Sequence, residues 1–202
     1  MYKDIVFDLG GVIVDVHVER AVNSFRALGV HDAAKLIDAS HHKDIFIDFE
    51  TGKIDTEEFC EMLSKHVGKP LARADIESAW MSIIDPPPQY KLNYISELRR
   101  QHRIFILTNN NPIIIGRVRS NGYCPDGKPL TAYIDKMYVS YEMKCCKPDA
   151  EIFRIMTADA GFNPAETLYI DDSPANTAAA AALGFQTLTV ANGTDWREKL
   201  PL

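Results

Sequence analysis

Short apolar segments alternate with helical segments through the second half of the chain, and this alternation constrains the fold most. Four of these segments are predicted strands, at 104–108, 133–140, 167–172 and 185–191. The N-terminal run DIVFDLGGVIV supplies a further buried strand, which breaks at Gly10 and Gly11. The pattern is typical of an α/β fold, and we expect a doubly wound parallel sheet with helices on both faces.

A long, mostly helical stretch interrupts the alternation after the first strand. It covers residues 16–86 and ends at three consecutive prolines, 86–88, which indicate a hinge or boundary. Ligands of parallel sheets bind beyond the carboxyl ends of the strands. We therefore expect a catalytic core of residues 1–15 and 87–202, with 16–86 inserted as a small helical cap over the active edge.

Helix signals are clear in parts of this insertion. Helices are expected at 18–28, 55–67 and 75–80. Gly29 ends the first helix and Gly68 ends the second, which begins with a capping box formed by Asp55 and Glu58. The segment 31–50 mixes polar and apolar residues, and its pattern predicts no element.

Charge and composition exclude several classes of partner. The chain has 202 residues and a net charge of −6, so it has no electrostatic reason to bind nucleic acid or an anionic membrane. No signal peptide and no apolar run of membrane-spanning length is visible.

The cysteines lack metal-ligand spacing; they are Cys60, Cys124, Cys145 and Cys146. We expect a reduced, cytoplasmic protein in which Cys124 is exposed and incidental.

Polar residues follow the predicted strands at the points where these strands end. They are Asp8, Thr108, Asn109, Lys147, Asp171 and Asp172. Each one alone is typical of a cap, a turn or a solvated surface. Together, three aspartates at one edge of a sheet repel one another unless a cation lies among them. Carboxylates in an open arrangement suit Mg²⁺, which we expect as the cofactor.

The order of these motifs resembles the haloacid dehalogenase superfamily over nearly the whole chain. The matching segments are FDLGGVIVD, ILTNNN, CCKPDAEIF and YIDDSPANTAAAAALGF. The insertion after the first motif is similar to that of the branch with a helical cap. This branch includes a bacterial sugar-1-phosphate phosphatase and the amino-terminal phosphatase domain of soluble epoxide hydrolase. The resemblance implies a Rossmann-like core and a phosphatase acting on a small phosphorylated metabolite.

The resemblance also implies a role for each residue. Asp8 would attack phosphorus and form an aspartyl-phosphate. The implied metal ligands are Asp8, the carbonyl of Gly10, Asp171 and Asp172. Asp172 is the expected direct ligand, whereas Asp171 is either a ligand or a partner of one, and Asn176 orients the metal site. Thr108, Asn109 and Lys147 would bind the transferring oxygens, and Lys147 would offset their charge.

One position departs from the pattern of the family's phosphatases. Most of them carry a second aspartate two residues after the nucleophile, which protonates the leaving oxygen, and this chain has Gly10 there. The substrate could have a good leaving group, such as that of a sugar 1-phosphate or an acyl phosphate. Another residue could instead supply the proton. The candidates are Asp15, His17, His41 and His42.

Two other functions stay open at this point. The family's 2-haloacid dehalogenases also lack the second aspartate, but they need no magnesium, and the acidic pair favours a metal. A degenerate, phosphate-binding protein without turnover is the other alternative. A signalling receiver domain fits poorly, because its acidic pair comes first in the chain. We expect Phe46, Phe49 and Trp80 to form the core of the cap; the oligomeric state is not predicted.

Overall fold

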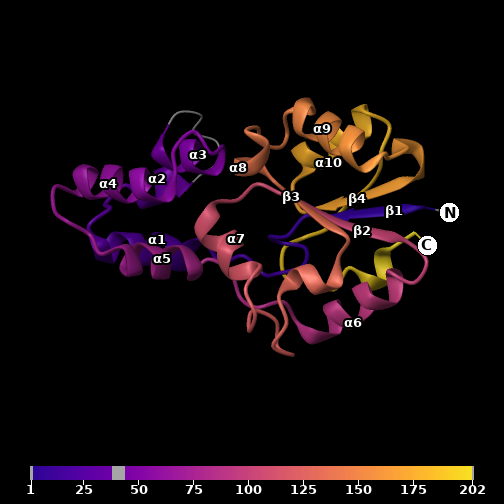
Figure 1. Ribbon diagram of the computed structural model, residues 1–202, viewed down its shortest axis with the longest axis horizontal. Coiled ribbons are helices and arrows are strands. Elements are labelled where there is room, and N and C mark those ends of the chain that lie inside the picture. Colours follow the sequence, from indigo (N-terminus) through magenta and orange to yellow (C-terminus); the bar gives the residue numbers. More distant parts are fainter. Residues whose placement is uncertain (1, 38–43, 202) are drawn as a thin grey trace.

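The computed structural model describes residues 2–37 and 44–201. Its centre is a five-stranded parallel sheet with the order β3-β2-β1-β4-β5 (Figure 1). The strands are β1 (Asp4–Phe7), β2 (Arg103–Thr108), β3 (Lys136–Val139), β4 (Thr167–Asp171) and β5 (Gln186–Thr189). The α/β parallel fold expected from the alternation is therefore confirmed.

Helices cover both faces of this sheet. They are α6 (Gln89–Leu98), α7 (Pro112–Val118), α8 (Ser140–Met143), α9 (Ala150–Ala160) and α10 (Pro174–Ala182), with short 3₁₀ turns at Leu130–Tyr133, Pro164–Glu166 and Arg197–Lys199. In Figure 1, α9 and α10 lie above the strands and α6 lies below them. Ile5 and Phe7 of β1 belong to one apolar cluster and Val6 to the other, so side chains of the strand alternate between two layers.

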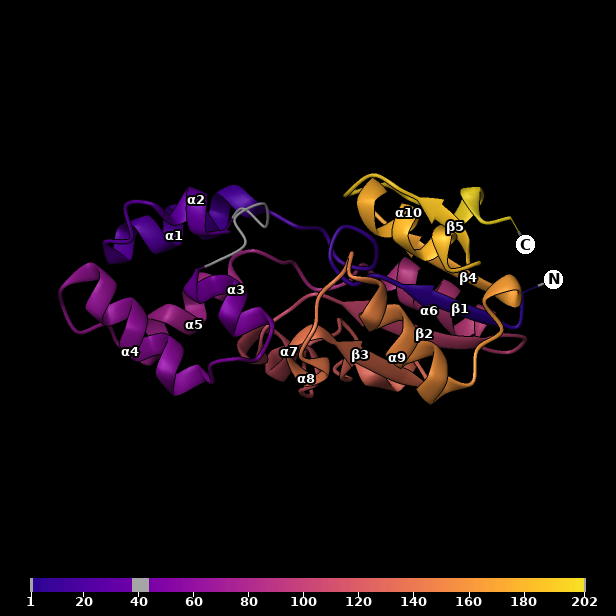
Figure 2. The same ribbon diagram turned by 90° about the horizontal axis from the view of Figure 1, so that it is seen from above.

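Five further helices gather beyond one end of the sheet (Figures 1 and 2). They are α1 (Val18–Leu28), α2 (Ala33–Ile37), α3 (Ile45–Glu50), α4 (Thr56–Val67) and α5 (Arg73–Met81). Phe25, Phe46, Phe59 and Trp80 pack together there, and Phe49 stacks on Phe59 with ring centroids 4.4 Å apart. The expected aromatic core is confirmed, while the domain boundaries at 16 and 86 stay predictions.

Two chain segments connect these helices with the sheet, and they run side by side. Val16 and Ile84 form an antiparallel bridge, and the amide of His17 donates to the carbonyl of Ile83 at 2.7 Å. The side chain of Asn192 accepts from the amide of Val16 at 3.0 Å and donates to its carbonyl at 2.9 Å. These bonds fix Val16 close to the carboxyl end of β1.

Most helix termini follow the sequence signals, with a few corrections. The capping box of Asp55 and Glu58 is present, and Gly68 ends that helix in a left-handed conformation. The fifth helix begins at Arg73 and not at Asp75. The segment PDAEIFRIMTADAG predicts a helix opened by Pro148, but α9 begins at Ala150, because the side chain of Asp149 caps it by accepting from the amide of Glu151.

Two further expectations differ from the structure. The pattern of QYKLNYISELRRQH, residues 89–102, predicts a helix over its whole length, but helix α6 ends at Leu98, before the charged residues RRQH. Cys124 is buried and not exposed, since only 3% of its surface is accessible and it packs in the larger apolar cluster. His41 and His42 lie outside the described residues.

Candidate active site

Asp8 is the first residue after β1, and the turn that follows it holds its carboxylate in place. The amide of Asp8 donates to the carbonyl of Ile170 at 2.8 Å, which continues the pairing with β4. The amide of Leu9 donates to Oδ1 of Asp8 at 2.6 Å. The chain then turns back on itself, as the amide of Gly11 donates to the carbonyl of Val14 at 2.8 Å. Asp8 Oδ2 is left facing the loop that carries Lys147.

Lys147 bridges two of the three aspartates. Its Nζ lies 2.9 Å from Oδ2 of Asp8 and 2.8 Å from Oδ2 of Asp171. The carbonyl of Leu107 accepts a third hydrogen bond from Nζ at 3.0 Å. Burial opposes the charged form, but the two carboxylates outweigh it and raise the pKa of Lys147. The lysine is therefore a fixed positive charge at the carboxyl edge of the sheet.

The carboxylate of Asp171 is saturated with protein donors. Oδ1 accepts from the amide of Ser173 at 2.8 Å, and the Asn176 side chain donates to both oxygens at 3.0 and 3.1 Å. Lys147 and the hydroxyl of Tyr169 donate to Oδ2. Although burial opposes ionisation, these donors lower the pKa of Asp171. Asp171 thus holds Lys147 in position through the ion pair between them.

Asp172 is more exposed than Asp171 and points toward the N-terminal turn. Carboxylate oxygens of Asp8, Asp171 and Asp172 all lie within 4.8 Å of one another. Burial raises the pKa of Asp8 to about 7; Lys147 opposes this shift, and the charges of the other two aspartates add to it. One lysine does not neutralise three close carboxylates, and their oxygens are the ligands that Mg²⁺ prefers. The donor set therefore fits this ion.

Residues at the end of β2 complete the polar wall. Thr108 is buried, with 1% of its surface accessible. The side chain of Asn109 donates to the carbonyl of Lys147 at 2.9 Å and accepts from its amide at 2.8 Å. This reciprocal pair ties the end of β2 to the lysine loop, so the structure brings Thr108, Asn109 and Lys147 together with Asp8.

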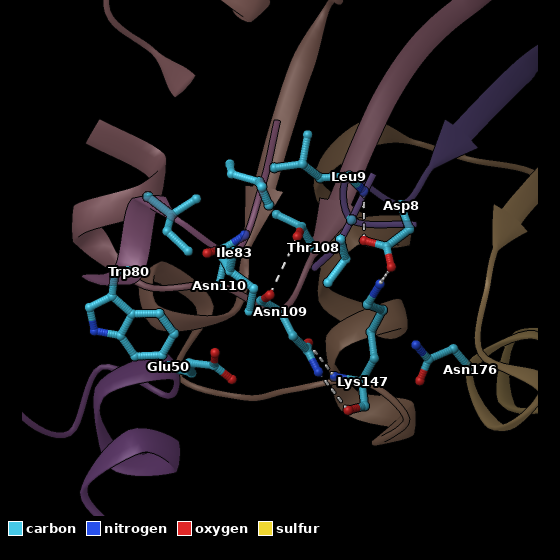
Figure 3. Close-up of a pocket in the computed structure, with 14 residues that line it drawn as sticks. Asp8, Leu9, Glu50, Trp80, Ile83, Thr108, Asn109, Asn110, Lys147 and Asn176 are labelled. Atoms are coloured by element: carbon cyan, nitrogen blue, oxygen red, sulfur yellow. Dashed lines mark hydrogen bonds and ion pairs between the residues drawn. The ribbon is translucent and has the colours of Figure 1, made fainter. Parts of the chain in front are cut away.

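These residues line a cavity of about 170 Å³ between the sheet and the helices beyond it (Figure 3). Its floor comes from Asp8, Leu9, Gly10, Thr108, Asn109, Asn110, Ile114, Lys147 and Asn176. The opposite wall consists of Val16, Glu50, Trp80, Ile83 and Ile84. Asp172 lines an adjoining hollow, which shares Gly10, Glu50 and Asn109 with this cavity. The arrangement places a carboxylate, a lysine and a metal-binding group around one cavity.

Comparison with known proteins identifies the family. The haloacid dehalogenase-like hydrolases match residues 2–184. The chain belongs to this family. A D-ribitol-5-phosphate phosphatase of Bacteroides thetaiotaomicron is 39% identical over 200 residues, which cover 99% of this chain and 97% of the relative.

Solved structures of haloacid dehalogenase-like proteins superpose closely on this chain. A family hydrolase of Porphyromonas gingivalis has a TM-score of 0.94 and 39% identity, over 98% of this chain and 96% of that one. A family enzyme of B. thetaiotaomicron, in complex with magnesium and inorganic phosphate, has a TM-score of 0.92 and 34% identity, over 99% and 100%. An L-2-haloacid dehalogenase of Xanthobacter autotrophicus is 16% identical with a TM-score of 0.62, over 96% and 80%, and so shares the fold alone.

A side chain at the position of the missing family aspartate would crowd Val16 in this hydrolase. A β-carbon on Gly10 would lie 2.9 Å from Cγ2 of Val16. Two of the residues expected to replace the aspartate have other contacts. Nζ of Lys91 lies 3.6 Å from the Asp15 carboxylate, and His17 pairs with Asp85 at 2.7 Å. Neither is among the described residues that line the cavity.

Glu50 is a titratable residue of the site that the sequence did not predict. It is the last residue of α3 and lies in the segment 31–50, whose pattern gave no element. A clear helical period was absent because α2 and α3 are short. Within residues 2–37 and 44–201, no helix is long and apolar enough to cross a membrane.

Proposed function

We propose that the protein is a magnesium-dependent phosphatase that hydrolyses a small phosphate monoester of a sugar or polyol. The observation that carries the proposal is the position of Asp8, whose Oδ2 lies 2.9 Å from Lys147 Nζ at the wall of the cavity. The D-ribitol-5-phosphate phosphatase supports the substrate class, and the relative that holds magnesium and inorganic phosphate supports the cofactor.

Asp8 would act as the nucleophile. Its carboxylate attacks phosphorus, the bond to the leaving oxygen breaks, and an aspartyl-phosphate forms, which water then hydrolyses. Asp8, Asp172 and the Gly10 carbonyl would hold Mg²⁺, which would supply positive charge to offset that of the nucleophile and the phosphate. The turn at Leu9 orients the carboxylate before the substrate arrives.

The remaining polar groups would hold the phosphoryl group. Lys147 contributes a buried positive charge, and its ion pairs fix Nζ so that little reorganisation is needed during the reaction. The Thr108 hydroxyl and the Asn109 amide add hydrogen-bond donors at the end of β2. Asp171 keeps Lys147 in position and leaves Asp172 to the metal.

The division into a core of 1–15 and 87–202 with a cap of 16–86 is part of the same proposal. The side-by-side segments at Val16 and Ile84 support this division, because both pass between the helices α1–α5 and the sheet at one place. Residues of the cap then form the wall of the cavity that faces the sheet, where the alcohol part of the ester would lie.

A panel of phosphate esters with Mg²⁺ or with EDTA tests the function, with Asp8→Asn as the control variant. We expect EDTA-sensitive release of phosphate, fastest with sugar or polyol phosphates, and none from Asp8→Asn. Halide release from 2-chloropropionate in EDTA would instead support a dehalogenase. Hydrolysis no faster than that of Asp8→Asn across the panel would indicate a phosphate-binding protein without turnover.

A further inference from the structure

We propose that the Glu50 carboxyl, on the cap side of the cavity, is the catalytic acid and base of this phosphatase. The inference rests on the proposed phosphatase function and adds to it the source of the proton. Glu50 would protonate the leaving oxygen in the first step and activate water in the second, two tasks that Gly10 has no side chain to perform.

The need for such a group follows from the leaving oxygen. A sugar or polyol leaves as an alkoxide, which is a poor leaving group unless it receives a proton as the bond breaks. Val16 occupies the space beside Gly10, and Asn192 holds Val16 there through two hydrogen bonds. The proton would therefore come from a residue other than the one at position 10.

Glu50 is placed on the wall that this chemistry requires. In a phosphoryl transfer the leaving oxygen lies roughly in line with the attacking oxygen, on the far side of phosphorus. Figure 3 shows the Glu50 carboxylate and the Asp8 carboxylate at opposite sides of the cavity, with Asn109 between them. A proton donor at Glu50 would thus face the departing oxygen of a substrate whose phosphorus lies at Asp8.

The main chain of Glu50 is anchored to the core, so its side chain has a defined origin. The hydroxyl of Ser140 donates to the carbonyl of Glu50 at 2.6 Å. The same Ser140 oxygen accepts from the amide of Asn110 at 2.9 Å, close to the end of β2. These contacts involve only backbone atoms of Glu50, so a change of its side chain leaves the anchor intact.

The surroundings of Glu50 allow it to hold a proton and to release it near neutral pH. Burial raises the pKa of Glu50 to about 7, and the charge of Asp44 adds to the shift. The Cys146 thiol lies beside it, and burial raises the pKa of this thiol to about 11, so it stays neutral. An acid–base catalyst works best when its pKa lies close to the working pH.

The proton balance closes over one turnover. In the first step the Asp8 oxygen bonds to phosphorus, the bond between phosphorus and the ester oxygen breaks, and protonated Glu50 gives its proton to that oxygen, which leaves as the alcohol. In the second step the Glu50 carboxylate takes a proton from water, the water oxygen bonds to phosphorus, and the bond between phosphorus and the Asp8 oxygen breaks. Inorganic phosphate leaves, and Asp8 and protonated Glu50 are regenerated.

The test compares Glu50→Gln with wild type on two esters that differ in their leaving group. One is the alkyl phosphate that wild type hydrolyses fastest; the other is 4-nitrophenyl phosphate, whose phenolate leaves without a proton. We expect kcat/KM to fall about 10²–10⁴-fold for the alkyl ester and less than about tenfold for the aryl ester. The aryl ester should also show a burst of nitrophenolate, because the second step loses its base.

Glu57→Gln is the matched control, since Glu57 is an exposed glutamate of the neighbouring helix α4. Glu57→Gln should leave kcat/KM unchanged for both esters. An equal loss of kcat/KM on both esters in Glu50→Gln would overturn the proposal in favour of a positioning or binding role, and an unchanged kcat/KM would overturn it outright. If wild type hydrolyses neither ester with Mg²⁺, the phosphatase function itself fails, which is a distinct result.

Discussion

A β-carbon on Gly11 would lie 2.1 Å from Oδ2 of Asp172. The two residues are far apart in sequence, yet the absence of a side chain at the first creates the space for the carboxylate of the second. Gly11 also has a φ of +75°, a left-handed conformation that L-residues with side chains rarely adopt. The N-terminal turn and the acidic pair are therefore one structural unit.

Gly11→Ala should weaken magnesium binding by about 10–100-fold, because Asp172 must move away from the metal site. Gly122→Ala is the control: Gly122 has a φ of +79°, and a β-carbon there meets no atom within 4 Å. Both variants should lose about 1–2 kcal/mol of unfolding free energy from backbone strain. Calorimetric titration with Mg²⁺ separates them; equal affinities in the two variants would contradict this coupling.

Asp171→Asn and Asp172→Asn should differ in their effect on the metal. Both carboxylate oxygens of Asp171 accept hydrogen bonds from protein donors. Asp171→Asn should therefore weaken magnesium binding only indirectly, by roughly 10–100-fold, because the groups around the metal site lose their fixed positions. Asp172 is expected to bind the metal directly, so Asp172→Asn should weaken magnesium binding more than Asp171→Asn does. Magnesium titrations of the two purified variants measure the order. A larger loss in Asp171→Asn would mean that Asp171 is the direct ligand.

Lys147→Met should destabilise the protein strongly in EDTA at pH 8. The substitution leaves the buried carboxylates of Asp8 and Asp171 without their cation, and breaking such a pair costs about 3–5 kcal/mol. Added Mg²⁺ should restore part of the loss. Urea unfolding measures both effects. Lys128→Met breaks the exposed pair with Asp126 and should change the free energy of unfolding little. If Lys147→Met lowers the free energy of unfolding no more than Lys128→Met does, the ion pairs of Lys147 add no stability.

Glu50→Gln should make the protein more stable than wild type at pH 8 but not at pH 5. The folded pKa of Glu50 is about 7, above its ordinary value of 4.5, so between these values the folded state binds more protons than the unfolded state. The free energy of unfolding therefore falls as the pH rises through this range, by up to about 3 kcal/mol. Glutamine does not titrate, so the free energy of unfolding of Glu50→Gln lacks this decrease between pH 5 and pH 8.

Urea unfolding of both proteins in EDTA at the two pH values checks this expectation. The pKa of Asp8 is also raised, but Asp8 is present in both proteins, so its contribution cancels in the difference between them. Asp44, whose charge adds to the shift, and the neutral thiol of Cys146 are likewise present in both proteins. A pH-independent difference between the variant and wild type would show that Glu50 is ionised throughout.

Local signals were sufficient for the framework of the fold. Asp55, Glu58 and Gly68 mark the two ends of α4, because capping and left-handed termination depend on a few neighbouring residues. The convergence of Asp8, Lys147 and Asp171 was predictable for a related reason. Parallel strands all end at the same edge, so residues that follow different strands meet there whatever the packing around them.

The sequence by itself thus determined the parallel sheet, the set of charged residues at its edge, and the absence of an acid at Gly10. Only the tertiary structure decided that both oxygens of Asp171 accept hydrogen bonds from protein donors, that Asp172 faces Gly11, and that Glu50 reaches the cavity. The physical reason is distance along the chain. These outcomes depend on contacts between segments far apart in sequence, such as the bond from Ser140 to Glu50, and no local pattern encodes such contacts.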